Sequence, residues 1–131
     1  MACQIEFEEL KMRYESYRPK STLWETFLDG RKQLQSNLYI ATFVLGFIAE
    51  KWLRSYVLQI NKTFSYLPEM IYQALTKKLI APEVGQILHD VQVQYTSLKH
   101  NPSFQPDFQK VLRLYKVFQQ KIMNHIQRNF T

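Results

Sequence analysis

The sequence predicts an all-α protein, a compact bundle of about five to six helices around a central hydrophobic helix. Only three glycines and five prolines occur in 131 residues, so the turn residues that a series of β-hairpins requires are missing. Apolar residues instead recur at intervals of three and four, which places them on one face of a helix. A hydrophobic content of 46% supports a packed core, and the length predicts one helical-bundle domain over residues 1–131.

The first two helices are expected on either side of Pro19. Residues 4–17 carry apolar side chains on one helical face, and Pro19 ends this helix. A second helix begins at Thr22, because the side chains of Thr22 and Glu25 have the spacing of a capping box. Gly30 predicts a break or bend in this second helix, since glycine costs about 1 kcal/mol relative to alanine in a helix interior.

The third helix is expected over about residues 36–61, and its first half is apolar on every side. Such a helix belongs at the centre of a bundle. The strongly apolar stretch of residues 38–49 spans twelve residues, whereas a helix that crosses a bilayer needs about twenty. We therefore interpret it as a buried core helix whose second half, carrying Lys51 and Arg54, reaches solvent.

Prolines indicate the remaining boundaries. Ser65 is a candidate cap for a shorter helix that has Pro68 in its first turn and runs to about Lys78. Pro82 marks the first turn of the next helix, which runs to about residue 99. Residues 100–106 contain two prolines and predict a loop, after which the C-terminal helix extends to about Asn129.

The charge is basic and unevenly distributed. Seventeen Lys and Arg against eleven Asp and Glu give a formal net charge of +6. Residues 1–17 carry four acids and two bases, so the positive charge belongs to the rest of the chain. Cys3 is the single cysteine, and no basic-then-apolar leader is visible at the N-terminus, so we expect a reducing, cytoplasmic location.

The C-terminal helix gives the one indication of chemistry. Its apolar residues cover one broad face, and no acidic residue occurs after Asp107. The helix therefore lacks the acid–base pairs at i,i+4 that solvated helices commonly use. A narrow opposite stripe, flanked by Lys116, Gln120 and Gln127, contains Lys110, Arg113, Lys121, Asn124 and Arg128. A line of like charges with amide donors among them suits a phosphate backbone and binding without base readout.

Two other interpretations of this stripe stay open. A basic protein must place its lysines somewhere, so the stripe is also explained as an ordinary solvated face. A basic amphipathic helix also suits an anionic membrane surface. We expect no membrane binding, because the apolar face of this helix is needed to cover residues 38–49.

Catalytic, metal and cofactor sites are not expected. His89, His100 and His125 are scattered, with no Cys or carboxylate at metal-ligand spacing, and the isolated glycines form no phosphate-binding loop. Ordinary ion pairs and helix-end electrostatics explain Glu50, Glu69 and Glu83. The many aromatic residues are interpreted as core, with Tyr66 and Tyr72 left as candidates for base stacking.

A stretch of about residues 38–98 resembles the small helical subunit of CRISPR effector complexes. The resemblance rests on Phe43-Val44-Leu45-Gly46, which open a hydrophobic helix running to Gln59, and on the pattern that follows it. That pattern comprises residues 64–67, Lys78-Leu79 and the helix of residues 84–95. The resemblance implies a non-catalytic subunit that assembles in several copies and holds target or displaced strands by their backbones through Lys and Arg.

The sequence thus predicts a non-enzymatic, nucleic-acid-binding subunit of a nucleoprotein complex. RNA or single-stranded DNA is the expected ligand, and other protein subunits, including further copies of this chain, are the expected protein partners. The residues expected to contact the phosphates are Lys110, Arg113, Lys116, Lys121 and Arg128, with help from Lys51 and Arg54. The alternative is a helical adaptor or assembly chaperone that binds an acidic protein surface, using the same stripe or the Tyr-rich residues 64–72.

Overall fold

The computed structural model describes residue 14 and residues 17–60 and 66–131. These residues form an all-helical bundle with no strands, as the sequence predicts. Five α-helices lie in the described part: α2 (Leu23–Ser36), α3 (Leu38–Lys51), α4 (Leu67–Thr76), α5 (Pro82–His100) and α6 (Phe108–Lys121). A π-helical turn, η1 (Trp52–Val57), continues α3, and a short 3-10 turn, η2 (Met123–His125), follows α6.

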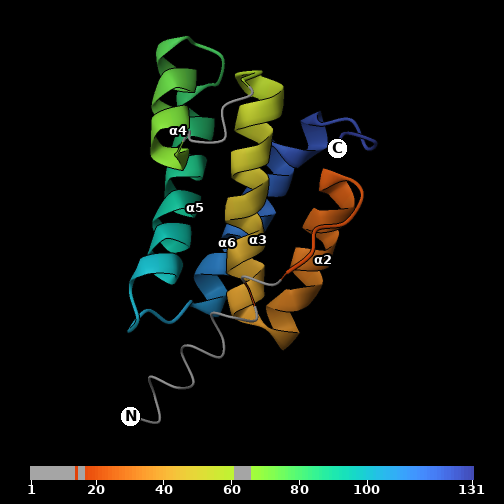
Figure 1. Cartoon of the computed structure of the whole chain (residues 1–131), viewed down its shortest axis with the longest axis vertical. Coiled ribbons are helices and arrows are strands. Elements are labelled where there is room, and N and C mark those ends of the chain that lie inside the picture. Colours follow the sequence, from red (N-terminus) through yellow and green to blue (C-terminus); the bar gives the residue numbers. More distant parts are fainter. Residues whose placement is uncertain (1–13, 15–16, 61–65) are drawn as a thin grey trace.

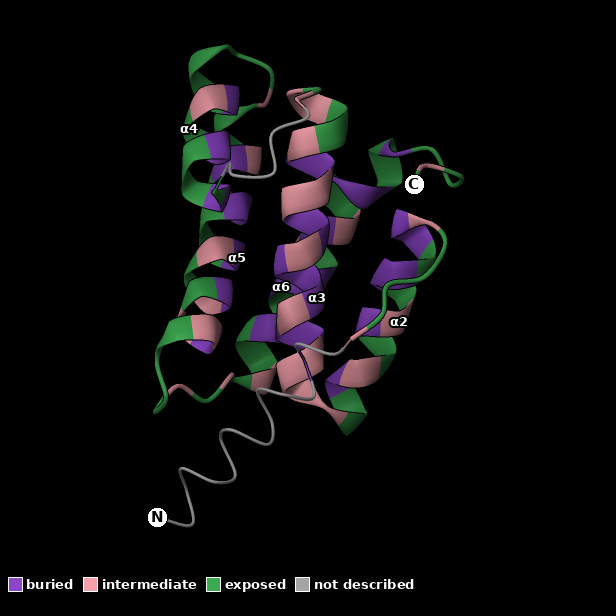
Figure 2. Cartoon of the chain, in the orientation of Figure 1, coloured by how far each residue is buried: buried purple, intermediate pink, exposed green. Residues whose placement is uncertain are grey.

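Helix α3 lies at the centre of the bundle, as its all-round hydrophobicity predicts (Figure 1). Helices α2 and α5 flank it and α6 packs behind it, while α4 packs against α5 and against η1 at the end of α3. The buried side of each surrounding helix points toward α3 (Figure 2). Of the third helix expected over about residues 36–61, only Leu38–Lys51 is α-helical, and the chain continues as the π-helical turn η1 to Val57. The last residue of the expected helix, Asn61, lies outside the described residues.

The predicted break at Gly30 is wrong, and the reason is packing. Helix α2 runs without interruption through Gly30, which is buried. A Cβ atom at this position would overlap with Tyr115 Oη and lie 2.7 Å from Val44 Cγ1. Glycine therefore occupies this position because α2 approaches both α3 and α6 closely here, and this contact outweighs its poor helix propensity.

Side-chain hydrogen bonds tie α6, the C-terminal segment and Tyr14 to this core. The buried Tyr115 hydroxyl on α6 donates to the Ala41 carbonyl of α3 at 2.6 Å. Trp24 Nε1 donates to the Ile126 carbonyl at 3.1 Å, which fixes the C-terminal segment against α2. Tyr14 is fully buried and donates to the Leu98 carbonyl of α5 at 3.2 Å. The rest of the first expected helix, residues 4–17, is almost wholly outside the described residues.

Most of the predicted helix boundaries agree with the structure. Thr22 caps α2 by accepting a hydrogen bond from the Glu25 amide at 3.1 Å. Pro68 and Pro82 occupy the first turns of α4 and α5, and residues 101–107 join α5 to α6 without helical structure. The expected cap Ser65 lies outside the described residues.

Candidate functional site

Helix α6 carries four exposed cations and no acid. Asp107 caps its first turn, accepting from the Gln109 amide at 2.8 Å and from the Lys110 amide at 3.4 Å. Val111, Leu114, Tyr115 and Phe118 bury the inner side of the helix. The exposed cations are Lys110, Arg113, Lys116 and Lys121. We call this set the α6 basic surface.

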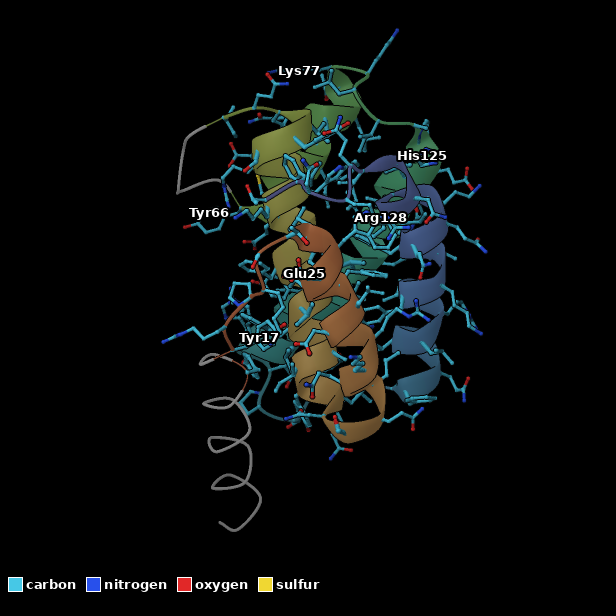
Figure 3. The ribbon with its side chains drawn as sticks, turned by 90° about the vertical axis from the view of Figure 1, so that its right-hand side faces the viewer. Tyr17, Glu25, Tyr66, Lys77, His125 and Arg128 are labelled. Atoms are coloured by element: carbon cyan, nitrogen blue, oxygen red, sulfur yellow. The ribbon has the colours of Figure 1, made fainter. Side chains whose placement is uncertain are left out.

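The C-terminal helix is shorter than predicted, and this removes Arg128 from the set. Helix α6 ends at Lys121, since Ile122 has φ −122° and ψ −62°, and a 3-10 turn follows. Ile122, Met123 and Ile126 are all buried, so the chain turns toward the core after Lys121. The polar residues that follow therefore do not continue the stripe of α6. Arg128 instead stacks its guanidinium over the Trp24 ring, 3.5 Å from the ring centroid. Figure 3 shows Arg128 near the C-terminal end of the bundle.

Lys51 and Arg54 lie outside the α6 basic surface, because Lys51 is the last residue of α3 and Arg54 lies in η1. Helix α6 packs on the side of α3 that carries Ala41, whose carbonyl accepts from Tyr115. Arg54 belongs to the π-helical turn η1, which follows α3, and there its guanidinium lies 3.9 Å from the Glu50 carboxylate. The structure therefore brings together four of the seven sequence-predicted binding residues, and places Arg128, Lys51 and Arg54 elsewhere.

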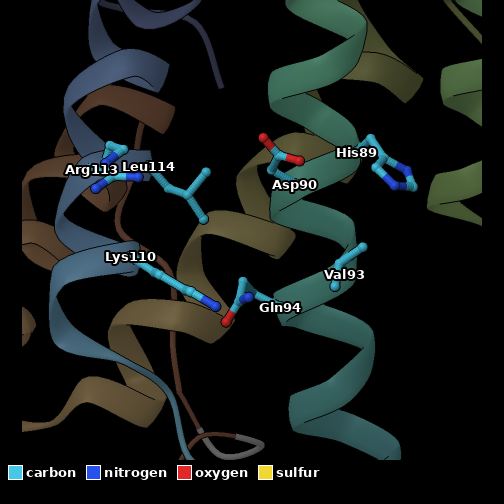
Figure 4. Close-up of a pocket in the computed structure, with 7 residues that line it drawn as sticks. All are labelled: His89, Asp90, Val93, Gln94, Lys110, Arg113 and Leu114. Atoms are coloured by element: carbon cyan, nitrogen blue, oxygen red, sulfur yellow. The ribbon is translucent and has the colours of Figure 1, made fainter.

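A cleft of about 290 Å³ opens between α5 and α6, next to the basic surface. Its lining combines two cations, one acid, one amide, one imidazole and two apolar side chains. These residues are Lys110, Arg113 and Leu114 of α6 and His89, Asp90, Val93 and Gln94 of α5. Figure 4 shows Asp90 and Gln94 directed toward α6, with Lys110 reaching back toward Gln94, whereas His89 points away. The two helices are antiparallel, so side chains of α5 and α6 face each other along the cleft.

Helix α5 supplies the acids that α6 lacks. Glu83 Oε1 lies 3.4 Å from Lys121 Nζ and forms an exposed ion pair between the start of α5 and the end of α6. Asp90 accepts a hydrogen bond from Gln86 Nε2 at 3.0 Å, within its own helix. The carboxylates of Glu83 and Asp90 therefore reduce the positive potential along one edge of the basic surface.

Arg31 of α2 extends the basic surface on its other side. Arg31 Nη1 donates to Gln119 Oε1 of α6 at 2.9 Å. Lys116 lies three residues before Gln119 on α6, so Arg31 and Lys116 border the same α2-facing edge. The sequence pattern of residues 108–121 does not reveal Arg31, because only the packing of α2 against α6 brings this residue to the basic surface. With Arg31 included, the surface carries five cations, and the two carboxylates of Glu83 and Asp90 lie along its α5 edge.

Glu50 and Tyr95 form a partly buried polar contact between α3 and α5. Burial raises the pKa of the Glu50 carboxyl, and the nearby charges of Lys99 and Arg54 and a hydrogen bond with Tyr95 oppose that rise. Burial, followed by the charge of Glu50, raises the pKa of the Tyr95 hydroxyl. Lys99 Nζ lies 4.7 Å from the Tyr95 ring centroid. Glu50 and Glu83 each lie within ion-pair distance of a cation, Arg54 and Lys121 respectively.

A second cleft, of about 430 Å³, lies between α4 and α5. It is mainly apolar, and Ile71, Tyr72, Leu75 and Gly85 are among its lining residues. Tyr72, at the edge of this cleft, is 70% exposed, and Tyr66, just before α4, is 73% exposed. Neither tyrosine belongs to the core, so both remain available for contact with a partner.

In the described part of the chain, no three His, Cys, Asp or Glu side chains are grouped closely enough to hold a metal ion. Among the helices described, none has the length and hydrophobicity that crossing a bilayer requires.

The fold and the cleft define a class rather than a family: an all-helical protein with a basic cleft between two antiparallel helices. No protein-family model matches the chain, and comparison with curated proteins and with solved structures finds no match.

Proposed function

We propose that this protein binds RNA or single-stranded DNA by the phosphate backbone, as a non-catalytic helical subunit of a nucleoprotein complex. The acid-free α6 basic surface carries the proposal. Its cations recur along one exposed helix surface over about three turns, and Arg31 adds a fifth charge beside them. Cations spaced along a rod displace the counterions that condense on a nucleic-acid backbone, and this release supplies sequence-independent affinity.

The proposed role is that of the small helical subunit of CRISPR effector complexes, which residues 38–98 resemble. A subunit of that kind holds a strand without catalysing a reaction and contacts neighbouring protein subunits. The exposed tyrosines Tyr66 and Tyr72 lie with α4, on the far side of α5 from α6. This separation leaves α4 free for a protein neighbour while α6 holds a strand.

The experiment is fluorescence anisotropy of a labelled single strand of about 30 nucleotides across a salt series. The test variant combines Lys110→Gln, Arg113→Gln and Lys116→Gln, and it leaves the Lys121–Glu83 ion pair in place. Each lost phosphate contact lowers the log–log salt slope by about 0.7 on a single strand, so three lost contacts lower it by about 2. A variant with Arg18→Gln, Lys20→Gln and Lys77→Gln removes the same charge from exposed positions outside α6.

The two variants separate a binding surface from net charge. A slope that flattens in the test variant alone supports the α6 basic surface as the phosphate contact. Equal flattening in both variants would show that only overall charge acts, and the proposal for α6 would fail.

The second candidate function is a helical adaptor that binds an acidic protein surface. The specific observation in its favour is the exposure of Tyr66 and Tyr72 beside the apolar α4–α5 cleft, because exposed tyrosines are enriched at protein interfaces. An adaptor forms a complex of defined stoichiometry with a protein and retains no nucleic acid. Absence of strand binding near 100 mM salt, together with such a complex, would favour this candidate.

A further inference from the structure

The α5–α6 cleft has a lining that backbone binding alone does not explain. Lys110 and Arg113 suit a phosphate, but Asp90 points into the same cleft and repels one (Figure 4). The side chains of Val93 and Leu114 add apolar surface to the lining. A ligand that matches the whole cleft therefore needs an anionic group, an apolar body and a hydrogen-bond donor that can face a carboxylate.

A single nucleotide has all three properties. Its phosphate is anionic, its base is a flat ring with apolar faces, and the base edge carries hydrogen-bond donors. The cleft volume of about 290 Å³ is at the lower limit of small-molecule sites, which are roughly 300 to 1,000 Å³. Unstacked bases of single strands are commonly bound in this way, with the ring against side chains and the Watson–Crick edge hydrogen-bonded.

The carboxylate of Asp90 selects among the bases. Guanine presents two adjacent donors on its Watson–Crick edge, N1–H and N2–H, which match the two oxygens of one carboxylate. Adenine, cytosine and uracil or thymine each place a ring or carbonyl acceptor beside their donor, so a carboxylate faces a repelling lone pair. Gln86 occupies one lone pair of Asp90 at 3.0 Å, which steadies the carboxylate and leaves further lone pairs for a ligand.

Gln94 and the cations complete the match. Gln94 lies one helical turn beyond Asp90 on the same side of α5, and its amide can donate to the guanine O6 acceptor next to N1–H. Lys110 and Arg113, on the opposite wall, supply the positive charges that a phosphate requires. The donors and acceptors on the two walls thus correspond to the two ends of one guanine nucleotide.

We propose that the cleft between α5 and α6 binds one unstacked guanine nucleotide, with its base edge on Asp90 and Gln94 and its phosphate on Lys110 and Arg113. This inference rests on the proposed function and deepens it. The protein holds a strand by its backbone, and it prefers strands that place a guanine at this cleft.

The test compares two 30-nucleotide strands, oligo(dT) and the same strand with an isolated dG at every fifth position, which prevents structures built from guanine runs. The full chain binds the dG-containing strand about five- to tenfold more tightly, at the low end of the discrimination known for a carboxylate or amide facing a base. Asp90→Asn removes this preference, because an amide presents one donor and one acceptor in place of two acceptors. Its affinity for oligo(dT) stays the same or rises, since a repelling charge is gone.

Glu83→Gln is the matched control. It removes a carboxylate of α5 that does not line the cleft and frees Lys121 of the basic surface, so affinity rises for both strands while the preference for dG remains. A general charge effect of Asp90→Asn would give the same result as this control, and that result would overturn the inference.

Failure of the inference and failure of the proposed function give different results. Equal, salt-dependent binding of both strands by the unmodified protein overturns the guanine site and leaves backbone binding intact. No binding of either strand near 100 mM salt overturns the proposed function. In that case backbone amide NMR shifts, measured on titration with 5′-GMP and with 5′-AMP, test whether the cleft binds a guanine nucleotide. Equal shifts around Asp90 and Gln94 with both nucleotides would overturn the site.

Discussion

The Arg128 guanidinium lies over the Trp24 ring at 3.5 Å, and the Trp24 Nε1 hydrogen bond to Ile126 holds the same segment. Arg128 thus fixes the C-terminal segment to α2. Leu23 N also donates to the Phe130 carbonyl at 3.0 Å, so three contacts join the last residues to the start of α2. Arg128, which the sequence pattern predicts as a phosphate contact, instead packs on Trp24 and holds the fold together.

Arg128→Gln should therefore affect stability more than binding. Loss of the cation–π contact with Trp24 should lower the free energy of unfolding by about 0.5 to 1 kcal/mol, measured by urea denaturation. Lys116→Gln is the matched comparison, since it removes an exposed cation from α6, and it should weaken strand binding with little change in stability. Equal losses of strand binding in the two variants would contradict this assignment of Arg128.

Gly30→Ala should destabilise the protein, although the same change stabilises an exposed helix by about 1 kcal/mol. The added methyl group overlaps with Tyr115 Oη and lies 2.7 Å from Val44 Cγ1, and overpacking of this kind costs about 1 to 3 kcal/mol. Tyr115→Phe alone should cost about 1 kcal/mol through the lost hydrogen bond to Ala41.

The double variant tests the Gly30 contact directly. Removing the Tyr115 hydroxyl removes the nearest obstacle, so Gly30→Ala should cost less in the Tyr115→Phe background, as measured by a double-mutant cycle. Strict additivity, or a stabilising Gly30→Ala, would show that the close approach of α2 to α6 is not what selects glycine.

Glu50 should make stability depend on pH. Its folded-state pKa is raised, so its contribution to stability is fully present below the unfolded pKa, for which 4.5 is the reference value, and is lost as pH rises through the folded pKa. The stability of the unmodified protein relative to Glu50→Gln should therefore be greater at pH 4 than at pH 7. Urea denaturation at both pH values gives this difference directly, and a difference of the opposite sign would show that Lys99 and Arg54 outweigh burial.

Asp107 should matter as the cap of the helix that carries the basic surface. Asp107→Ala removes the acceptor of the Gln109 and Lys110 amides and should cost about 1 kcal/mol. Asp107→Asn is the matched control, because asparagine caps about as well as aspartate, and it should remain close to the unmodified protein in thermal denaturation. A loss with asparagine as large as with alanine would assign the effect to the charge of Asp107 at the helix N-terminus.

Much of the candidate site was predictable, because it depends on one helix. The periodicity of residues 108–121 and the absence of acids after Asp107 place Lys110, Arg113, Lys116 and Lys121 on the solvent side of α6. The opposing wall was not predictable. Nothing local to Asp90 or Gln94 indicates that α5 turns these side chains toward α6, and nothing local to Arg31 indicates that it reaches Gln119.

The sequence by itself determined the helical class, the central position of α3 and most helix starts, because these depend on hydrophobic periodicity and on caps and prolines within a few residues. The tertiary structure decided the rest. It kept α2 continuous through Gly30, where two neighbouring helices leave room only for glycine, and it ended α6 at Lys121, where buried Ile122, Met123 and Ile126 turn the chain inward. It also set Asp90 opposite Lys110 and Arg113, since which charges meet across a cleft depends on how two helices pack and not on the sequence of either one.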